Sequence, residues 1–183
     1  AVYREADGLR SIGALAATLP EPLGSELRAM AAGYAHASAA EWPQLARRSE
    51  APEVLAHADA LLALLADPAL AEAAGANVQA LLLRKASDIR ADHDLRVALS
   101  QTHVNPLKWL GMAFLGFLTL VSVAMAHLER PRAAFAAVLL FALAAAPTAA
   151  IVLIQGNPFQ QPSSVTAAPI AAVAKALERP AAP

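Results

Sequence analysis

The spacing of hydrophobic residues divides the chain into two halves. Residues 1–104 carry most of the charge, and their apolar residues recur three or four positions apart. No run of strictly alternating apolar and polar residues occurs there. This spacing is typical of amphipathic helices, whereas alternation would indicate strands. Two long stretches beyond residue 104 contain almost no charge. The pattern predicts an all-α chain with three parts: an extramembrane helical bundle in 1–104, a transmembrane region in 105–155 and an extended tail in 156–183.

The two uncharged stretches predict a transmembrane hairpin with spans at about 107–128 and 133–154. A helix of that length covers about 30 Å, which is the thickness of the hydrocarbon core of a bilayer. Lys108 and Trp109 are interpreted as interfacial anchors, because an ammonium group and an indole both favour the headgroup boundary. A pair of buried core helices is the alternative, and the length without charge favours the membrane.

The second span contains a proline and a regular series of small residues. Pro147 removes a backbone hydrogen bond and is expected to kink the helix, a structural role more common in membrane helices than gating. Ala142, Ala146 and Ala150 lie four positions apart and predict a smooth face for helix packing. In the first span, Thr119 and Ser122 are expected to return their hydroxyl hydrogen bonds to the preceding turn.

Apolar stripes and turn signals predict successive helices in the first half. Asp67 followed by Pro68 is a helix-start signal, since aspartate caps the backbone and proline suits the first helical position. No strong stop signal follows before Asn105 and Pro106, so one long helix is expected from Asp67 to the membrane. The other predicted helices are a stripe over 9–19, a second over 23–42, a third over 52–66 and a short helix over 170–177 in the tail.

Charged residues recur along the long predicted helix. Arg84, Asp88, Asp92 and Arg96 follow one another at four-residue intervals. Opposite charges at this spacing face each other on a helix, so the four residues are interpreted as a charge ladder. A carboxylate pair, Asp88 with Asp92, that holds a cation or a proton is the alternative, and the flanking arginines favour the ladder.

No pattern in the sequence points to an enzyme. The chain has no cysteine, and its histidines lack the spacing that places two imidazoles on one helical face. Phosphate-binding glycine loops and nucleophile motifs are also missing. We therefore expect no catalytic residue, no cofactor and no metal. His127, near the membrane edge, is interpreted as an interfacial polar residue, with a proton-linked role as the alternative.

The charge balance gives no support for nucleic acid as a partner. The chain has 14 basic and 15 acidic residues, and 57% of its residues are hydrophobic. Without a basic excess there is no general attraction to phosphate backbones. The expected partners are membrane lipid and either other membrane subunits or copies of the chain itself.

Several short motifs along the chain carry a resemblance to a known family. They are Leu19–Pro20, the run LRAMAAGY that ends at Tyr34, EWP at 41–43, NPF at 157–159 and the segment Thr166 to Ile170. Their order resembles that of the bestrophin-like family of bacterial integral membrane proteins. The resemblance implies a helical domain inserted between two pairs of membrane helices. The chain begins at Ala1 without methionine, and we expect it to represent the part of such a protein that follows the first pair.

The resemblance and the residues together define the expected location and two functional hypotheses. A bacterial inner membrane is expected, with the bundle and the tail on the cytoplasmic side because Arg90, Arg96, Lys108 and Lys175 lie there. The first hypothesis is a non-catalytic structural or accessory subunit. The second, implied by the resemblance, is an anion channel formed by several copies of the chain, since two spans cannot enclose a pore. A membrane enzyme is a third reading without a supporting motif.

Overall fold

A computed structural model of the chain describes residues 1–101, 106–127, 129–154, 157–161 and 164–179. Within these residues the fold is all-α, as predicted, and no strand occurs. The predicted break at Asn105 and the predicted end of the first span at Leu128 lie outside the described residues. The helices are α1 (Val2–Ala16), α2 (Leu23–Ala40), α3 (Trp42–Ala46), α4 (Pro52–Leu65), α5 (Pro68–Ala74), α6 (Ala76–Gln101), α7 (Pro106–Ala126), α8 (Pro131–Ile154) and α9 (Ala168–Glu178).

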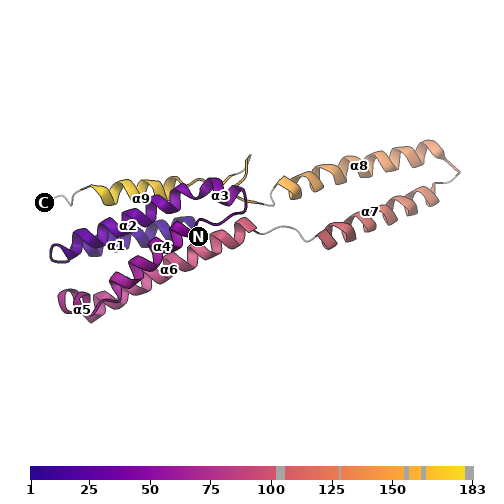
Figure 1. Cartoon of the computed structure of the whole chain (residues 1–183). Helices are drawn as coiled ribbons and strands as arrows, with labels where there is room; N and C mark the ends of the chain where they lie inside the picture. The colour runs from indigo at the N-terminus through magenta and orange to yellow at the C-terminus, as the bar shows by residue number, and fades with distance from the viewer. Residues whose placement is uncertain (102–105, 128, 155–156, 162–163, 180–183) are drawn as a thin grey trace. The chain divides into compact units, whose positions relative to one another are not determined.

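The contacts divide the chain into two compact units (Figure 1). One unit, here called the bundle, contains Ala1–Gln101 and Pro158–Pro183. The other, here called the hairpin, contains Thr102–Asn157 and is formed by α7 and α8. The two units pack differently, because the bundle has an apolar core and the described residues of the hairpin form none.

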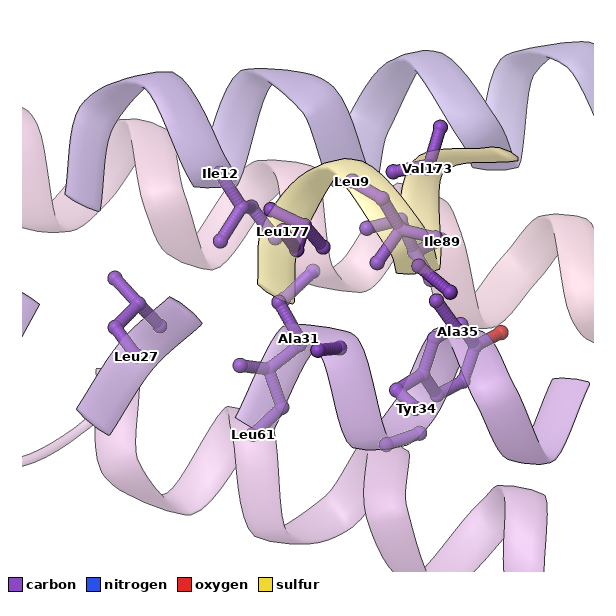
Figure 2. Packing of buried hydrophobic residues seen from close by; sticks show 14 of the residues in the cluster. Leu9, Ile12, Leu27, Ala31, Tyr34, Ala35, Leu61, Ile89, Val173 and Leu177 are labelled. Atoms are coloured by element: carbon purple, nitrogen blue, oxygen red, sulfur yellow. The ribbon is translucent and has the colours of Figure 1, made fainter. Parts of the chain in front are cut away.

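Helices α1, α2, α4, α6 and α9 build the bundle by packing against one another. Leu9, Ile12, Leu27, Leu61 and Ile89, each at most 2% exposed, come from four of these helices and meet in the core. Figure 2 shows Val173 and Leu177 of α9 among them. The short helix predicted in the tail is therefore present as α9 and belongs to the bundle core, a grouping that the predicted three-part division did not contain.

Two glycines adjust the backbone of the bundle. Gly24, in the first turn of α2, lies so close to α1 that an added Cβ atom would be 2.5 Å from the carbonyl oxygen of Ala16. Gly75 has φ +83°, a conformation that residues with a side chain rarely adopt. It ends α5 before α6 begins, so the prediction of one unbroken helix from Asp67 to the membrane was wrong. The predicted start was correct, because the Asp67 carboxylate accepts a hydrogen bond from the Ala69 N–H at 2.8 Å.

The hairpin consists of two long apolar helices. Leu107–Ala126 and Pro131–Ile151 are long and apolar enough to cross a membrane, and neither has a residue buried within the structure. Thr119 and Ser122 donate their hydroxyl hydrogen bonds to Leu115 and Leu118 one turn earlier, as predicted. These two hydroxyls are therefore paired within their own helix, which is what a hydrocarbon environment requires.

Candidate functional site

A fully buried arginine in the bundle is the centre of the most polar site that the structure describes. Arg96 on α6 is 0% exposed, and its guanidinium reaches one side chain on α1, one on α2 and one at the junction of α2 and α3. Its Nη1 donates to Glu5 on α1, and its Nη2 donates to Ser38 Oγ and to Glu41 Oε2, both at 2.9 Å. Two carboxylates on separate segments are thus held by one cation.

The Glu5 carboxylate accepts two further hydrogen bonds, both from α2. The Tyr34 hydroxyl donates to Glu5 Oε1 at 2.7 Å, and the Ser38 hydroxyl donates to the same oxygen at 2.8 Å. Burial raises the pKa of the Tyr34 hydroxyl far above its usual range, and the negative charge of Glu5 raises it further. Tyr34 therefore stays protonated and acts as a donor.

Glu41, at the junction of α2 and α3, accepts from Arg96 and lies against an imidazole. His93 Nε2 is 3.2 Å from Glu41 Oε1 and 3.1 Å from Oε2, and His93 is 3% exposed. Burial alone would raise the pKa of the Glu41 carboxyl. Hydrogen bonds and positive charge from His93 and then Arg96 outweigh burial, so the pKa lies below its ordinary value of 4.5. Glu41 is consequently a carboxylate at neutral pH.

Trp42 connects this charged cluster to the segment that precedes α9. The Arg96 guanidinium carbon lies 5.0 Å from the centroid of the indole ring, a cation–π distance. Trp42 makes two further contacts. Its Nε1 donates to the Val165 carbonyl at 2.6 Å, and its ring packs edge-on against Phe159 with 5.6 Å between the ring centroids. Gln160 also donates to the Ala46 carbonyl. Phe159, Gln160 and Val165 are therefore tied to α3 by polar and aromatic contacts.

The cluster has the composition of a structural site more than of a reactive one. Its two carboxylates already bind Arg96 and His93, and no bound molecule is needed to balance them. Within the described ranges, no three His, Asp or Glu side chains are grouped as a metal site would require. Removing one member of such a cluster leaves an uncompensated charge in the core, so the cluster fixes how α1, α2 and α6 fit together.

The four residues of the predicted charge ladder all lie on α6, but the observed ion-pair partners lie outside that helix. Arg84 and Asp88 are exposed. Asp92 lies 2.5 Å from Arg4 on α1, and Arg96 binds Glu5 and Glu41. In the part of the chain that the structure describes, no ion pair joins two of the four ladder residues to each other. The alternative, in which Asp88 and Asp92 hold a cation or a proton, stays a prediction, and Arg4 already pairs with Asp92.

The small residues predicted on α8 lie on its exposed side. Ala142, Ala146 and Ala150 are exposed, whereas Phe141 and Ala145 are partly covered and belong to the side nearer α7. Pro147 lies inside α8 as predicted, and the kink remains a prediction. On α7, Lys108 is exposed and Trp109 is partly covered, and their role as membrane anchors also remains a prediction.

Sequence reasoning missed the charged cluster, although the sequence contained a signal for it. Glu5 precedes Leu9 and Ile12 at helical spacing, and Glu41 follows Tyr34 and Ser38 in the same way. A charged residue that takes a position in an apolar stripe faces the core and needs a buried partner. Local spacing alone could not identify that partner, because the pairs are separated by 55 and 91 residues in sequence.

The comparisons with known proteins give one result for the chain. Residues 1–170 match the family model that describes a Bestrophin-like domain. No curated protein and no solved structure matches the chain. The match covers the cluster, the segment tied to Trp42 and both long apolar helices.

Proposed function

From the premise that this chain belongs to the Bestrophin-like family, we propose that it is a non-catalytic integral membrane protein, a structural or accessory subunit of a membrane complex. The family match and the two long apolar helices together identify a membrane protein. The proposal adds that the chain packs through its membrane helices and its bundle and carries out no reaction of its own.

One observation supports the proposal most directly. The face formed by Ala142, Ala146 and Ala150 is exposed and is not used to hold α7. In a membrane, small residues let helix backbones approach closely, and dispersion contacts then hold the helices together. A face of this kind on the free side of α8 suits a helix from another subunit or another copy of the chain.

The test replaces the small residues by large ones. Ala142→Leu combined with Ala146→Leu should separate the complex that is extracted gently from its membrane, as measured by native mass spectrometry. Ala144→Leu is the matched control, because it adds the same side chain at an exposed position on the opposite side of the helix. If the complex stays unchanged in the double variant as well as in the control, the proposal is contradicted.

The family membership favours a second candidate, an anion channel formed by identical copies. The two spans Leu107–Ala126 and Pro131–Ile151 contain one lysine near one end and one arginine near the other, so a pore between copies would be lined by uncharged side chains. A complex of identical copies that passes chloride in liposomes would support the channel. Unrelated subunits in the complex, without chloride flux, would support the accessory role.

The proposed location is a bacterial inner membrane, with the bundle on the cytoplasmic side. Because the chain has no cysteine, single cysteines can report the two sides separately. A membrane-impermeant maleimide should label Glu129→Cys in intact cells and label Ser49→Cys only after lysis. The reverse pattern would place the bundle on the outer side.

A further inference from the structure

The turn between the two spans carries positive charge without a partner. Glu129, Arg130, Pro131 and Arg132 are all exposed. Neither arginine forms an ion pair with any residue that the structure describes, although Glu129 is their close neighbour in sequence. Arg96 and Arg90, in contrast, both bind carboxylates. The turn therefore offers two free guanidinium groups against one carboxylate.

The position of the turn follows from the lengths of the spans. Leu107–Ala126 and Pro131–Ile151 are 20 and 21 residues long, which corresponds to about 30 Å each. That length equals the hydrocarbon thickness, so the short turn between them lies at the level of the lipid headgroups. Arginine at that depth is surrounded by phosphate groups and can bind them bidentately.

The surface around the turn combines charge with apolar side chains. One shallow hollow of about 540 Å³ is lined by Arg130, Pro131, Arg132 and Ala133. A second hollow, of about 370 Å³, shares Arg130 and is also lined by Met125, Ala126, His127 and Glu129. A guanidinium beside apolar helix ends suits a molecule that is itself amphiphilic, with an anionic head and an alkyl chain.

We propose that Arg130 and Arg132 form a binding surface for the headgroup of an anionic phospholipid, such as phosphatidylglycerol. The two arginines bind the phosphate, while Met125, Ala126 and Ala133 contact the first part of the acyl chains. A zwitterionic lipid has the same phosphate, but its ammonium group lies close to the guanidinium groups and repels them. The surface therefore selects lipids by net charge. The inference rests on the membrane spans and is independent of how the chain assembles.

The experiment measures how many lipids the full chain retains. Detergent-solubilised protein is titrated with phosphatidylglycerol or phosphatidylcholine, and the bound lipids are counted by native mass spectrometry. Arg130→Gln and Arg132→Gln are combined in one variant. The matched control is Arg47→Gln with Arg48→Gln, which removes the same charge from exposed arginines of the bundle.

The expected result is a preference for phosphatidylglycerol that the Arg130 and Arg132 variant loses and the control retains. Each arginine near an anionic lipid surface contributes about fivefold in affinity, so the double variant should bind about 25-fold more weakly. Raising the salt concentration should weaken binding to the unmodified chain more than to the variant.

Three results would overturn the proposal. Equal retention of both lipids by the unmodified chain would show that no selection by charge occurs. An equal loss of bound phosphatidylglycerol in the test variant and in the control would assign the effect to the overall charge of the chain. Displacement of the lipid by millimolar inorganic phosphate would identify a simple phosphate site without an acyl contribution. None of these results affects the Ala142 and Ala146 test, so failure of the two proposals can be distinguished.

Discussion

The bundle and the hairpin place charged and apolar side chains in opposite ways. In the bundle, Leu9 and Ile12 are fully buried, and the same core contains the charges of Arg96 and Glu5. In the hairpin, large apolar residues such as Phe114 and Leu140 are 59% and 68% exposed, and the charges lie at the helix ends. Water outside the bundle drives its apolar groups inward, whereas lipid around the hairpin removes that driving force.

This difference shows what each unit needs to be stable. The bundle supplies partners for most of the charge it buries: Arg96 binds Glu5 and Glu41, and Glu41 also meets His93. Arg96 Nε is buried without a hydrogen-bond partner among the described residues. The hairpin pairs the hydroxyls of Thr119, Ser122 and Thr148 within its own helices but leaves large apolar side chains exposed. Substitution of a buried charge or of an apolar side chain should therefore have different effects in the two units.

The largest effect is expected from breaking the buried charge cluster. Arg96→Met leaves Glu5 and Glu41 in the core without their cation and should cost about 3–5 kcal/mol of unfolding free energy. Arg90→Met, on the same helix, removes a pair with Asp59 that is partly exposed, and the expected cost is about 0–1 kcal/mol.

Unfolding of the bundle can be followed with Trp42 as a single reporter. The chain has 2 tryptophans, so Trp109→Phe in the hairpin leaves Trp42 alone. Denaturant unfolding of the full chain in detergent then gives the stability of both arginine variants. Equal losses for Arg96→Met and Arg90→Met would contradict the assignment of the buried cluster as structural.

A similar contrast applies to apolar truncations. Leu9→Ala removes a side chain that is 0% exposed in the bundle core, and we expect a loss of about 2–5 kcal/mol. Leu140→Ala on the hairpin removes a side chain that is 68% exposed, so Trp42-monitored unfolding should be unchanged. A large effect of Leu140→Ala on the bundle would show that the two units do not unfold independently.

The dependence of stability on pH tests the cluster in a different way. The pKa of Glu41 is lower in the folded chain than its ordinary value of 4.5. A carboxyl with a depressed pKa stabilises the fold above its ordinary value, and this contribution is lost as the pH falls through the folded value. The unmodified chain should lose stability over that acidic range, and Glu41→Gln should lose less. Identical acid profiles for the two proteins would contradict the prediction.

The smallest expected effect concerns a local helix start. Asp67→Ala removes the hydrogen bond to the Ala69 N–H that begins α5 and should cost about 1 kcal/mol. Asp67→Asn retains an acceptor oxygen and serves as the control, with most of the stability restored. A full loss in Asp67→Asn would assign the effect to the charge of Asp67 instead of the hydrogen bond.

The predictability of the fold differed between elements for physical reasons. The spans were predictable, because the absence of charge over a bilayer thickness is a property of composition alone. The start of α5 was also predictable, since Asp67 and Pro68 act on their immediate neighbours. The break at Gly75 was missed because one glycine is compatible with either a helix or its end, and the sequence does not show that its φ is positive.

The charged cluster illustrates the limit of local patterns most clearly. Spacing on α6 suggested that Arg96 pairs with Asp92, four residues earlier. In the folded bundle each of the two side chains has a partner on another helix, Arg4 for Asp92 and Glu5 for Arg96. A buried arginine binds the carboxylates that the core brings to it, and these come from α1 and from the end of α2.

The sequence by itself determined the all-α fold, the two long apolar helices and the separation of a charged half from an apolar half, because these follow from composition and local periodicity. Only the tertiary structure decided which charges are buried together, that α9 belongs to the bundle core and that Ala142, Ala146 and Ala150 lie on the free side of α8. These features depend on contacts between residues far apart in the chain, whose energies are set by burial and by the partners that folding brings within reach.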